Sequence, residues 1–254
     1  MKAVILIGGL GTRLRPFTLH TPKPLLPLLG KPFLSYLIDK CRIFGIQDII
    51  LCTAYKPETF RSVFGSGERL GVRLHYVHET SPLGTGGAIK NAEALIDDET
   101  LILNGDILMD VDFKELFTFH RQKKAAVTLT LTPVEDPTSY GLIELKADGS
   151  IQRFLEKPKP EEVTCNTINA GAYIFNKSVF QEIPANVIVS IERDTFPKLL
   201  QKGFSCFGML FNGYWLDMGT AAKYAQAHSD LLLGKYKWIE PEKIVSDMVN
   251  RYEK

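Results

Sequence analysis

The sequence predicts an α/β fold: a Rossmann-like, mostly parallel sheet with helices on both faces and a β-rich subregion. Three observations predict it. Residues 3–7 are an unbroken apolar run, as expected of a parallel strand covered on both faces. Strand and helix patterns then alternate with short turns as far as residue 103, which indicates a parallel sheet. From Ala125 onward, β-rich segments predominate.

Each element of the first half has its own signal. After the strand at 3–7, residues 33–44 form an amphipathic pattern that ends at Gly45, which predicts a helix. The elements expected next, in chain order, are a strand at 48–53, a helix at 57–63, a strand at 72–77, a helix at 86–95 and a strand at 100–103.

The second half is expected to start with two strands and a hairpin. Asp148 and Gly149 predict the hairpin turn. The expected elements are strands at 126–132, 141–146, 151–155 and 168–175, a helix at 192–201, a strand at 204–210 and a helix at 221–233. Because no repeat or low-complexity linker interrupts the chain, we expect one catalytic domain at 1–234 and a short tail at 235–254.

Composition excludes several classes of protein. The 254 residues include 30 Lys and Arg against 29 Asp and Glu, so no basic field favours nucleic acid or a membrane surface. The first apolar run is too short for a signal peptide, and no run approaches the roughly 20 residues of a spanning helix. The four cysteines are far apart in sequence, which predicts a cytoplasmic protein with reduced thiols. The five histidines lack metal-ligand spacing and are expected to be structural or surface residues.

A glycine-rich loop follows the first strand. Gly8, Gly9 and Gly11 remove side chains where backbone N–H groups can approach an anion. Arg13 and Lys23 add positive charge around the same bend. A Gly-Gly turn near cations is by itself often only a solvated loop. The pattern therefore predicts an anion site without identifying the anion.

Two familiar phosphate motifs do not fit this loop. A dinucleotide fingerprint needs glycine where the chain has Leu14, and a Walker A loop needs Gly-Lys-Ser/Thr where Thr12 and Arg13 follow Gly11. The run Gly-Gly-Leu-Gly-Thr-Arg-Leu-Arg-Pro at 8–16, with Pro-Lys-Pro-Leu at 22–25, instead resembles the signature of sugar-1-phosphate nucleotidyltransferases. The resemblance implies catalytic roles for Arg13 and Lys23 on the triphosphate, and nucleotide binding by Leu6, Gly8, Gly9, Gly11 and Thr12.

Two aspartates stand near the ends of strands. Asp106 follows the strand at 100–103, at a carboxyl end where open α/β sheets bind ligands, and Asp217 comes just after an expected aromatic strand. A single aspartate in such a place is more often a turn or cap residue. Two carboxylates that converge on a phosphate suit Mg²⁺. The resemblance implies that Asp106 and Asp217 converge as ligands of this ion.

The family pattern also implies a sugar-binding subregion in the β-rich half. On that pattern Glu156 accepts hydrogen bonds from sugar hydroxyls, and Lys157 holds the sugar phosphate as a third catalytic residue. Gly141, Asn169 and Gly171 match the other sugar-binding segments. For these glycines, a strand bulge or tight bend is an equally good reading without the family pattern.

Glu79 and Gly84 lie in the segment that the family uses to choose the base. A carboxylate only accepts hydrogen bonds, which suits the two adjacent donors of guanine and favours GTP. The runs Pro-Leu-Gly-Thr-Gly-Gly at 82–87 and Ser-Ile-Glu-Arg-Asp at 190–194 look like mannose- and manno-heptose-1-phosphate guanylyltransferases. The segment at 15–25 is also close to bacterial muramic-acid-1-phosphate uridylyltransferases, so the base stays open.

The resemblance spans residues 8 to 220 and implies an enzyme of nucleotide-sugar biosynthesis. Such an enzyme transfers a nucleotidyl group from an NTP, here GTP, to mannose- or heptose-1-phosphate, and forms an NDP-sugar and pyrophosphate. The alternatives are a uridylyl- or thymidylyltransferase acting on glucose- or muramic-acid-1-phosphate, and a non-catalytic regulatory subunit of the same fold. The expected partners are the two substrates and, in a homodimer, a second copy of the chain.

Overall fold

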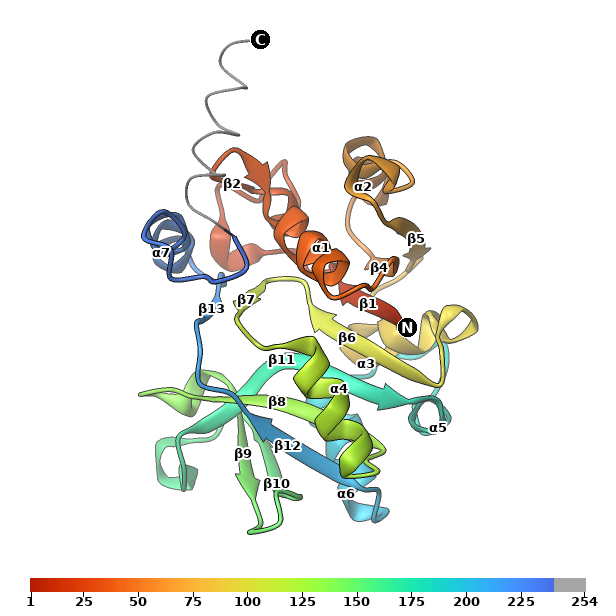
Figure 1. Cartoon of the computed structure of the whole chain (residues 1–254), viewed down its shortest axis with the longest axis vertical. Helices are drawn as coiled ribbons and strands as arrows, with labels where there is room; N and C mark the ends of the chain where they lie inside the picture. The colour runs from red at the N-terminus through yellow and green to blue at the C-terminus, as the bar shows by residue number, and fades with distance from the viewer. Residues whose placement is uncertain (240–254) are drawn as a thin grey trace.

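The computed structural model describes residues 1–239 and contains a nine-stranded sheet (Figure 1). Its first half is parallel, in the order β6, β1, β4, β5. These strands are β1 (Lys2–Leu6), β4 (Asp48–Thr53), β5 (Arg73–His78) and β6 (Glu99–Asn104). Each lies within one residue of its predicted position at both ends, and β4 matches its prediction at both ends.

The second half extends the same sheet with mostly antiparallel strands. β11 (Thr167–Asn176) is antiparallel to β6, and it joins the two halves. The further strands are β8 (Val127–Pro133), β9 (Gly141–Leu145), β10 (Ile151–Glu156) and β12 (Cys206–Leu210), of which only β12 pairs in parallel, with β8. β9 and β10 form the predicted hairpin. Two short ribbons, β2 (Pro27–Leu28) with β3 (Lys31–Pro32) and β7 (Ile107–Met109) with β13 (Trp215–Asp217), lie outside this sheet.

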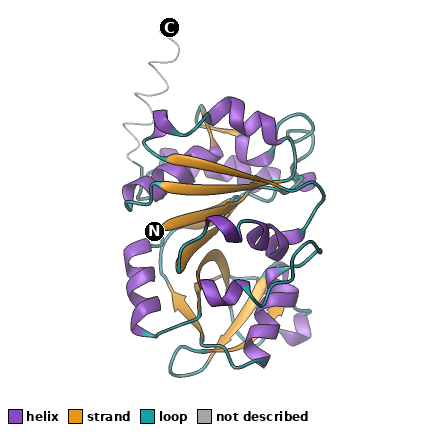
Figure 2. Ribbon diagram, turned by 90° about the vertical axis from the view of Figure 1, so that its right-hand side faces the viewer, coloured by secondary structure: helices purple, strands orange, loops and turns teal. Residues whose placement is uncertain are grey.

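Helices cover both faces of the sheet, as predicted (Figure 2). Side chains alternate along β1, so Ala3 and Ile5 belong to one apolar core and Val4 to the other. The first core is closed by α1 (Phe33–Ile43), α2 (Pro57–Phe64), α4 (Phe113–Gln122) and α7 (Ala221–Leu232). The second is closed by α3 (Gly84–Asn91), α5 (Lys177–Phe180) and α6 (Phe196–Gln201). Among the described residues, no helix is long and apolar enough to span a membrane.

Several elements differ from their predictions. The predicted helix at 86–95 is α3 followed by a separate 3₁₀ turn, Glu93–Leu95. The predicted helix at 192–201 begins as a π-helix, Ile191–Thr195, and continues as α6. α4 was not predicted, although Asp112 caps its N-terminus by accepting hydrogen bonds from two backbone N–H groups.

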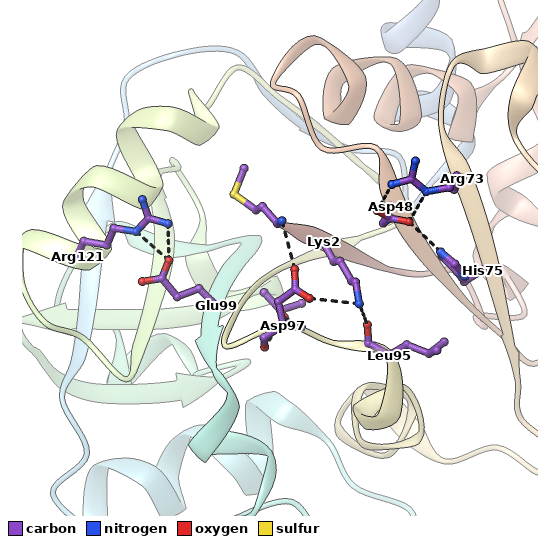
Figure 3. Close-up of polar contacts among 10 residues, drawn as sticks. Lys2, Asp48, Arg73, His75, Leu95, Asp97, Glu99 and Arg121 are labelled. Carbon is purple, nitrogen blue, oxygen red and sulfur yellow. Dashed lines mark hydrogen bonds and ion pairs between the residues drawn. The ribbon is translucent and has the colours of Figure 1, made fainter.

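Ion pairs gather at the amino ends of the parallel strands (Figure 3). Lys2 binds Asp97, and Arg121 binds Glu99 at the start of β6. Asp48, the first residue of β4, accepts from Arg73 and lies 3.1 Å from the His75 ring, and this arrangement lowers the pKa of its carboxyl group. Exposed pairs of this kind contribute little to stability, about 0–1 kcal/mol each. Their position leaves the opposite ends of the strands available for a ligand site.

The first residues of the predicted tail pack on the domain. Tyr236 is buried in the first core, and Trp238 packs against its edge. The rest of the predicted tail, 240–254, lies outside the described residues.

Lys40 is a charged side chain buried under the tail. It lies on α1, is 1% exposed, and donates to the carbonyl oxygen of Met109 at 2.5 Å. Its Nζ also lies 4.4 Å from the centroid of the Phe113 ring and 5.4 Å from that of Trp238. Burial lowers the pKa of Lys40 from 10.5 to about 7.

We expect the stability of the protein to depend on pH through Lys40. Between the folded pKa near 7 and the unfolded pKa near 10.5, the unfolded state binds more protons, so the free energy of unfolding rises with pH. At about 1.4 kcal/mol per pKa unit, the rise is at most about 5 kcal/mol. Urea unfolding between pH 6 and 10 measures this rise in the free energy of unfolding. In Lys40→Met, the part of the rise that comes from Lys40 should be absent.

The exposed Lys114, on α4, provides the control for the charge change, because Lys114→Met should follow the wild-type pH curve. Parallel curves for the wild type and Lys40→Met would show that Lys40 keeps an ordinary pKa.

Candidate functional site

A cleft of about 650 Å³ opens at the carboxyl ends of the parallel strands. This is where open α/β sheets place their ligands. Its wall is built from the loop after β1, the loop between β5 and α3, the turn after β6, and Gly219. The predicted site residues in the wall are Leu6, Gly8, Gly9, Gly11, Thr12, Arg13, Lys23, Glu79, Gly84 and Asp106. The structure thus brings the predicted nucleotide and phosphate residues into one cleft.

Gly11 shapes the loop after β1. Its φ is +61°, a conformation that favours glycine, and a Cβ there would lie 3.0 Å from Thr18 and 3.1 Å from Lys23. The Thr18 hydroxyl donates to the Gly11 carbonyl oxygen at 2.7 Å. The tight bend leads into the 3₁₀ turn Thr12–Leu14, which carries Arg13. The Arg13 guanidinium lies beside Gly219, 2.9 Å from where a Cβ on that residue would stand.

Asp106 and Asp217 converge, as predicted, although they are far apart in sequence. The β7–β13 ribbon pairs Asp217 with Ile107, and the Met218 N–H donates to the Asp106 carbonyl oxygen at 3.0 Å. The Lys23 ammonium lies 2.6 Å from Asp106 and 3.9 Å from Asp217. Lys23 and Asp217 are largely buried, with side chains 8% and 13% exposed, so water screens their interaction little, whereas the Asp106 side chain is 38% exposed.

The electrostatics of this pair suit a bound cation. Burial raises the pKa of Asp217, and the negative charge of Asp106 raises it further, while Lys23, Lys223 and Arg13 oppose the rise. The described residues contain no group of three or more His, Cys, Asp or Glu arranged to hold a metal. Two carboxylates fit Mg²⁺, which commonly takes one or two from the protein and the rest of its ligands from phosphate and water.

Glu79 forms the far wall of the cleft. It is 6% exposed, and one carboxylate oxygen accepts from the Leu83 N–H at 2.9 Å. The other oxygen lies 3.2 Å from the position of a Cβ on Gly8, so it faces the glycine loop. Burial raises the pKa of Glu79. Gly84 has a φ of +72°, and a Cβ there would meet the Val189 carbonyl oxygen at 2.5 Å.

Glu156, Lys157 and Gly141 come together at the β9–β10 hairpin. Glu156 ends β10, and a Cβ on Gly141 would lie 3.0 Å from its carboxylate. Lys157 is exposed, adopts a φ of +53°, and its N–H donates to the Tyr140 carbonyl oxygen at 2.8 Å. None of these three residues belongs to the cleft wall, so the residues predicted to bind the sugar at this hairpin form a group separate from the cleft.

Asn169 and Gly171 have structural roles in the bulge of β11. The Asn169 amide donates to the Tyr173 hydroxyl at 2.8 Å and accepts from the Gly171 N–H at 3.0 Å. Gly171 has a φ of +84°, and a Cβ there would lie 2.4 Å from the Ile107 side chain. Gly171 therefore lies in a strand bulge, one of the two interpretations that the sequence allowed. Contact of Asn169 or Gly171 with a sugar stays a prediction.

Lys223 is a site residue that sequence reasoning missed. Its ammonium lies 4.0 Å from Asp217 and donates to the Tyr140 hydroxyl, so it connects the acid pair with the residue next to Gly141. The sequence did contain a sign of this role. Thr220 caps α7 and places Lys223 in the first helical turn, where the helix dipole disfavours a cation, so a lysine there suggests a specific partner.

A glycine loop with cations and paired carboxylates, at the carboxyl ends of parallel strands, defines a nucleotide-binding α/β protein that handles phosphate groups. Residues 2–233 match the model of the nucleotidyl transferase family, and the chain belongs to that family.

Individual relatives agree with this assignment. The chain is 44% identical over 236 residues to the mannose-1-phosphate guanylyltransferase of Mycobacterium tuberculosis. The aligned region covers 92% of this chain and 65% of that protein. The chain thus spans somewhat less than two thirds of that relative's length. The crystal structure of HddC from Yersinia pseudotuberculosis superposes with a TM-score of 0.79 at 29% identity, and covers 91% of this chain and 99% of HddC. A second HddC structure, with a TM-score of 0.77, contains GMP-PN.

Proposed function

We propose that this chain transfers a guanylyl group from GTP to mannose- or heptose-1-phosphate, forming a GDP-sugar and pyrophosphate. The observation that carries the proposal is the convergence of Asp106 and Asp217 on Lys23, beside Arg13 in the glycine-loop cleft. The relative at 44% identity is named for this reaction with mannose 1-phosphate, and the HddC complex contains a guanine nucleotide analogue.

In the proposed mechanism, an oxygen of the sugar phosphate attacks the α-phosphorus in line, and the bond to pyrophosphate breaks on the opposite side. The attacking oxygen is already anionic, so no general base is required, and catalysis depends on positioning and charge stabilisation. Arg13 and Lys23 stabilise charge on the triphosphate, while Lys157 orients the incoming sugar phosphate. Asp106 and Asp217 would hold Mg²⁺, which when bound neutralises phosphate charge.

Glu79 supports the choice of guanine. Its oxygens only accept hydrogen bonds while the group is ionised, and one of them faces Gly8 inside the cleft. Guanine presents two adjacent donors to such an acceptor, whereas a pyrimidine imide presents a donor between acceptors. The carboxylate is fixed by the Leu83 N–H, so its orientation does not depend on the ligand.

Glu79→Gln should therefore weaken the preference for GTP over UTP. We expect the ratio of kcat/KM values to fall by about 10- to 100-fold, since the variant replaces a charged acceptor with a mixed donor and acceptor. Steady-state kinetics with both nucleotides measures the ratio. Glu68→Gln, at an exposed position outside the cleft, is the matched control. An unchanged ratio in Glu79→Gln would assign base choice to other residues.

Pyrophosphate release tests the whole proposal. The experiment combines GTP, UTP, dTTP, CTP and ATP with mannose-, glucose-, heptose- and muramic-acid-1-phosphate. We expect release with GTP and mannose- or heptose-1-phosphate. A preference for UTP with another sugar phosphate would overturn the choice of substrates. No release with any pair would favour the regulatory-subunit alternative, in which the chain binds nucleotide without catalysis.

We also propose that the protein works in the cytoplasm, in support of which all four cysteines are free thiols. The predicted homodimer stays a prediction, which light scattering of the purified protein would test.

A further inference from the structure

The segment Ser190 to Thr195 carries a charged cluster for which the proposed mechanism has no role. Ser190 caps the π-helix Ile191–Thr195 by accepting from the Arg193 N–H at 3.1 Å. Single π-helical turns are rare and often lie at functional sites. Here the turn places Glu192 against the beginning of α3.

The Glu192 carboxylate is fixed to the nucleotide cleft. One of its oxygens accepts from the Thr85 hydroxyl at 2.8 Å and from the Ser190 hydroxyl at 2.7 Å. The Thr85 hydroxyl in turn accepts from the Ile191 N–H at 2.9 Å. Thr85 belongs to the cleft wall, so Glu192 stands directly behind the segment expected to bind the base. Within residues 1–239, no hydrogen bond or ion pair uses its second oxygen, Oε1, which therefore remains available as an acceptor.

Glu192 also acts on the sugar-side carboxylate, Glu156. Burial raises the pKa of Glu156, and the negative charge of Glu192 raises it further, whereas Lys157 and Arg193 lower it. The π-helix packs against β10, the strand that ends at Glu156, and Phe196, directly after the π-helix, packs on Phe154 of β10 with ring centroids 5.1 Å apart. Both acids also raise the pKa of the buried Tyr173 hydroxyl.

Glu156 is a partly buried carboxylate that has no hydrogen-bond donor among the described residues and is repelled by a second acid, Glu192, which is an unfavourable arrangement in the free protein. A hydroxyl-rich ligand relieves it, because each hydroxyl donates a hydrogen bond to a charged acceptor. A sugar phosphate also brings its own charge, which the neighbouring Lys157 and Lys223 offset.

We propose that Glu192 is a specificity-determining residue whose free carboxylate oxygen, together with Glu156, accepts hydrogen bonds from the hydroxyls of the sugar. This inference rests on the proposed function. Because Thr85 and Ser190 hold Glu192 in place, its acceptor has a fixed direction and selects among sugars by the orientation of their hydroxyls.

Glu192→Gln tests the proposal with little change in shape. The glutamine carbonyl still accepts from Thr85 and Ser190, but the second oxygen becomes an NH₂ group that cannot accept. We expect the KM for mannose 1-phosphate to rise about tenfold or more and the KM for GTP to change less than about twofold. We also expect poorer discrimination between mannose- and glucose-1-phosphate.

Asp194→Asn is the matched control, because Asp194 lies on the same π-helix, is exposed, and accepts from the Ser190 N–H at 2.8 Å. It should keep wild-type kinetics, and both variants should melt near the wild type. Equal rises in the KM values for GTP and sugar phosphate, or an unchanged sugar KM, would overturn the proposal.

A direct binding measurement separates this inference from the proposed function. Calorimetric titration of mannose 1-phosphate, with a non-hydrolysable GTP analogue present, should show weaker binding to Glu192→Gln than to Asp194→Asn. If the wild type releases no pyrophosphate with any substrate pair but this difference in binding remains, the proposed function is wrong and sugar binding by Glu192 and Glu156 is supported. Equal binding to both variants would refute the carboxylate pair whatever the activity.

Discussion

Arg13→Ala is expected to lower kcat by about 100- to 1,000-fold, as removal of a preorganised electrostatic group does in comparable sites. Arg13 is exposed within the cleft, beside Gly219 and near enough to Asp217 to lower its pKa. In the proposed mechanism, a guanidinium at this position stabilises the charge that develops on the leaving pyrophosphate. Because that charge is largest in the transition state, we expect the main effect on kcat rather than on KM for GTP.

Two further variants show whether the effect comes from the charge and shape of the Arg13 guanidinium. Arg13→Lys keeps the charge but loses the planar fork, so it should recover only part of the activity. Arg69→Ala removes an exposed arginine outside the cleft wall and should leave kcat unchanged. Near-normal turnover in Arg13→Ala would show that the leaving group is stabilised by other residues.

The sequence was sufficient for elements whose signal is local. β1 and β4 are continuous apolar runs, a pattern that predicts strands buried on both faces of a sheet. α1 has an amphipathic pattern, which predicts a helix buried on one face. α4 was missed although its cap and its buried positions were readable, so that omission was avoidable. The β7–β13 ribbon is different, because its strands have three residues each and are stabilised only by a partner far along the chain.

The candidate site divides in the same way. Its phosphate half depends on one continuous loop, in which the bend at Gly11 and the charge of Arg13 can be read together. Its predicted sugar half is assembled from segments that are distant in sequence. Nothing in the sequence around Glu156 or around Glu192 indicates that the two residues are neighbours. The packing of the π-helix against α3 and β10 brings them together.

Asp217→Asn should change activity and stability in opposite directions. Burial and the charge of Asp106 raise the pKa of Asp217, which means that its ionised form is unfavourable in the ligand-free fold. Asparagine has nearly the same shape without the charge, so we expect the Tm of the free protein to rise. We expect kcat to fall by about 100-fold or more and the midpoint of Mg²⁺ activation to move to higher concentration, since asparagine is a weaker ligand of a hard cation.

Asp39→Asn is the control, because Asp39 lies on α1 and contacts Arg42 outside the cleft wall. It should keep both kcat and the midpoint of Mg²⁺ activation. A fall in Tm together with the fall in kcat would mean that Asp217 supports the β7–β13 ribbon rather than the ion. A rise in Tm with loss of turnover would instead show that the fold tolerates an unfavourable buried charge because the reaction requires it.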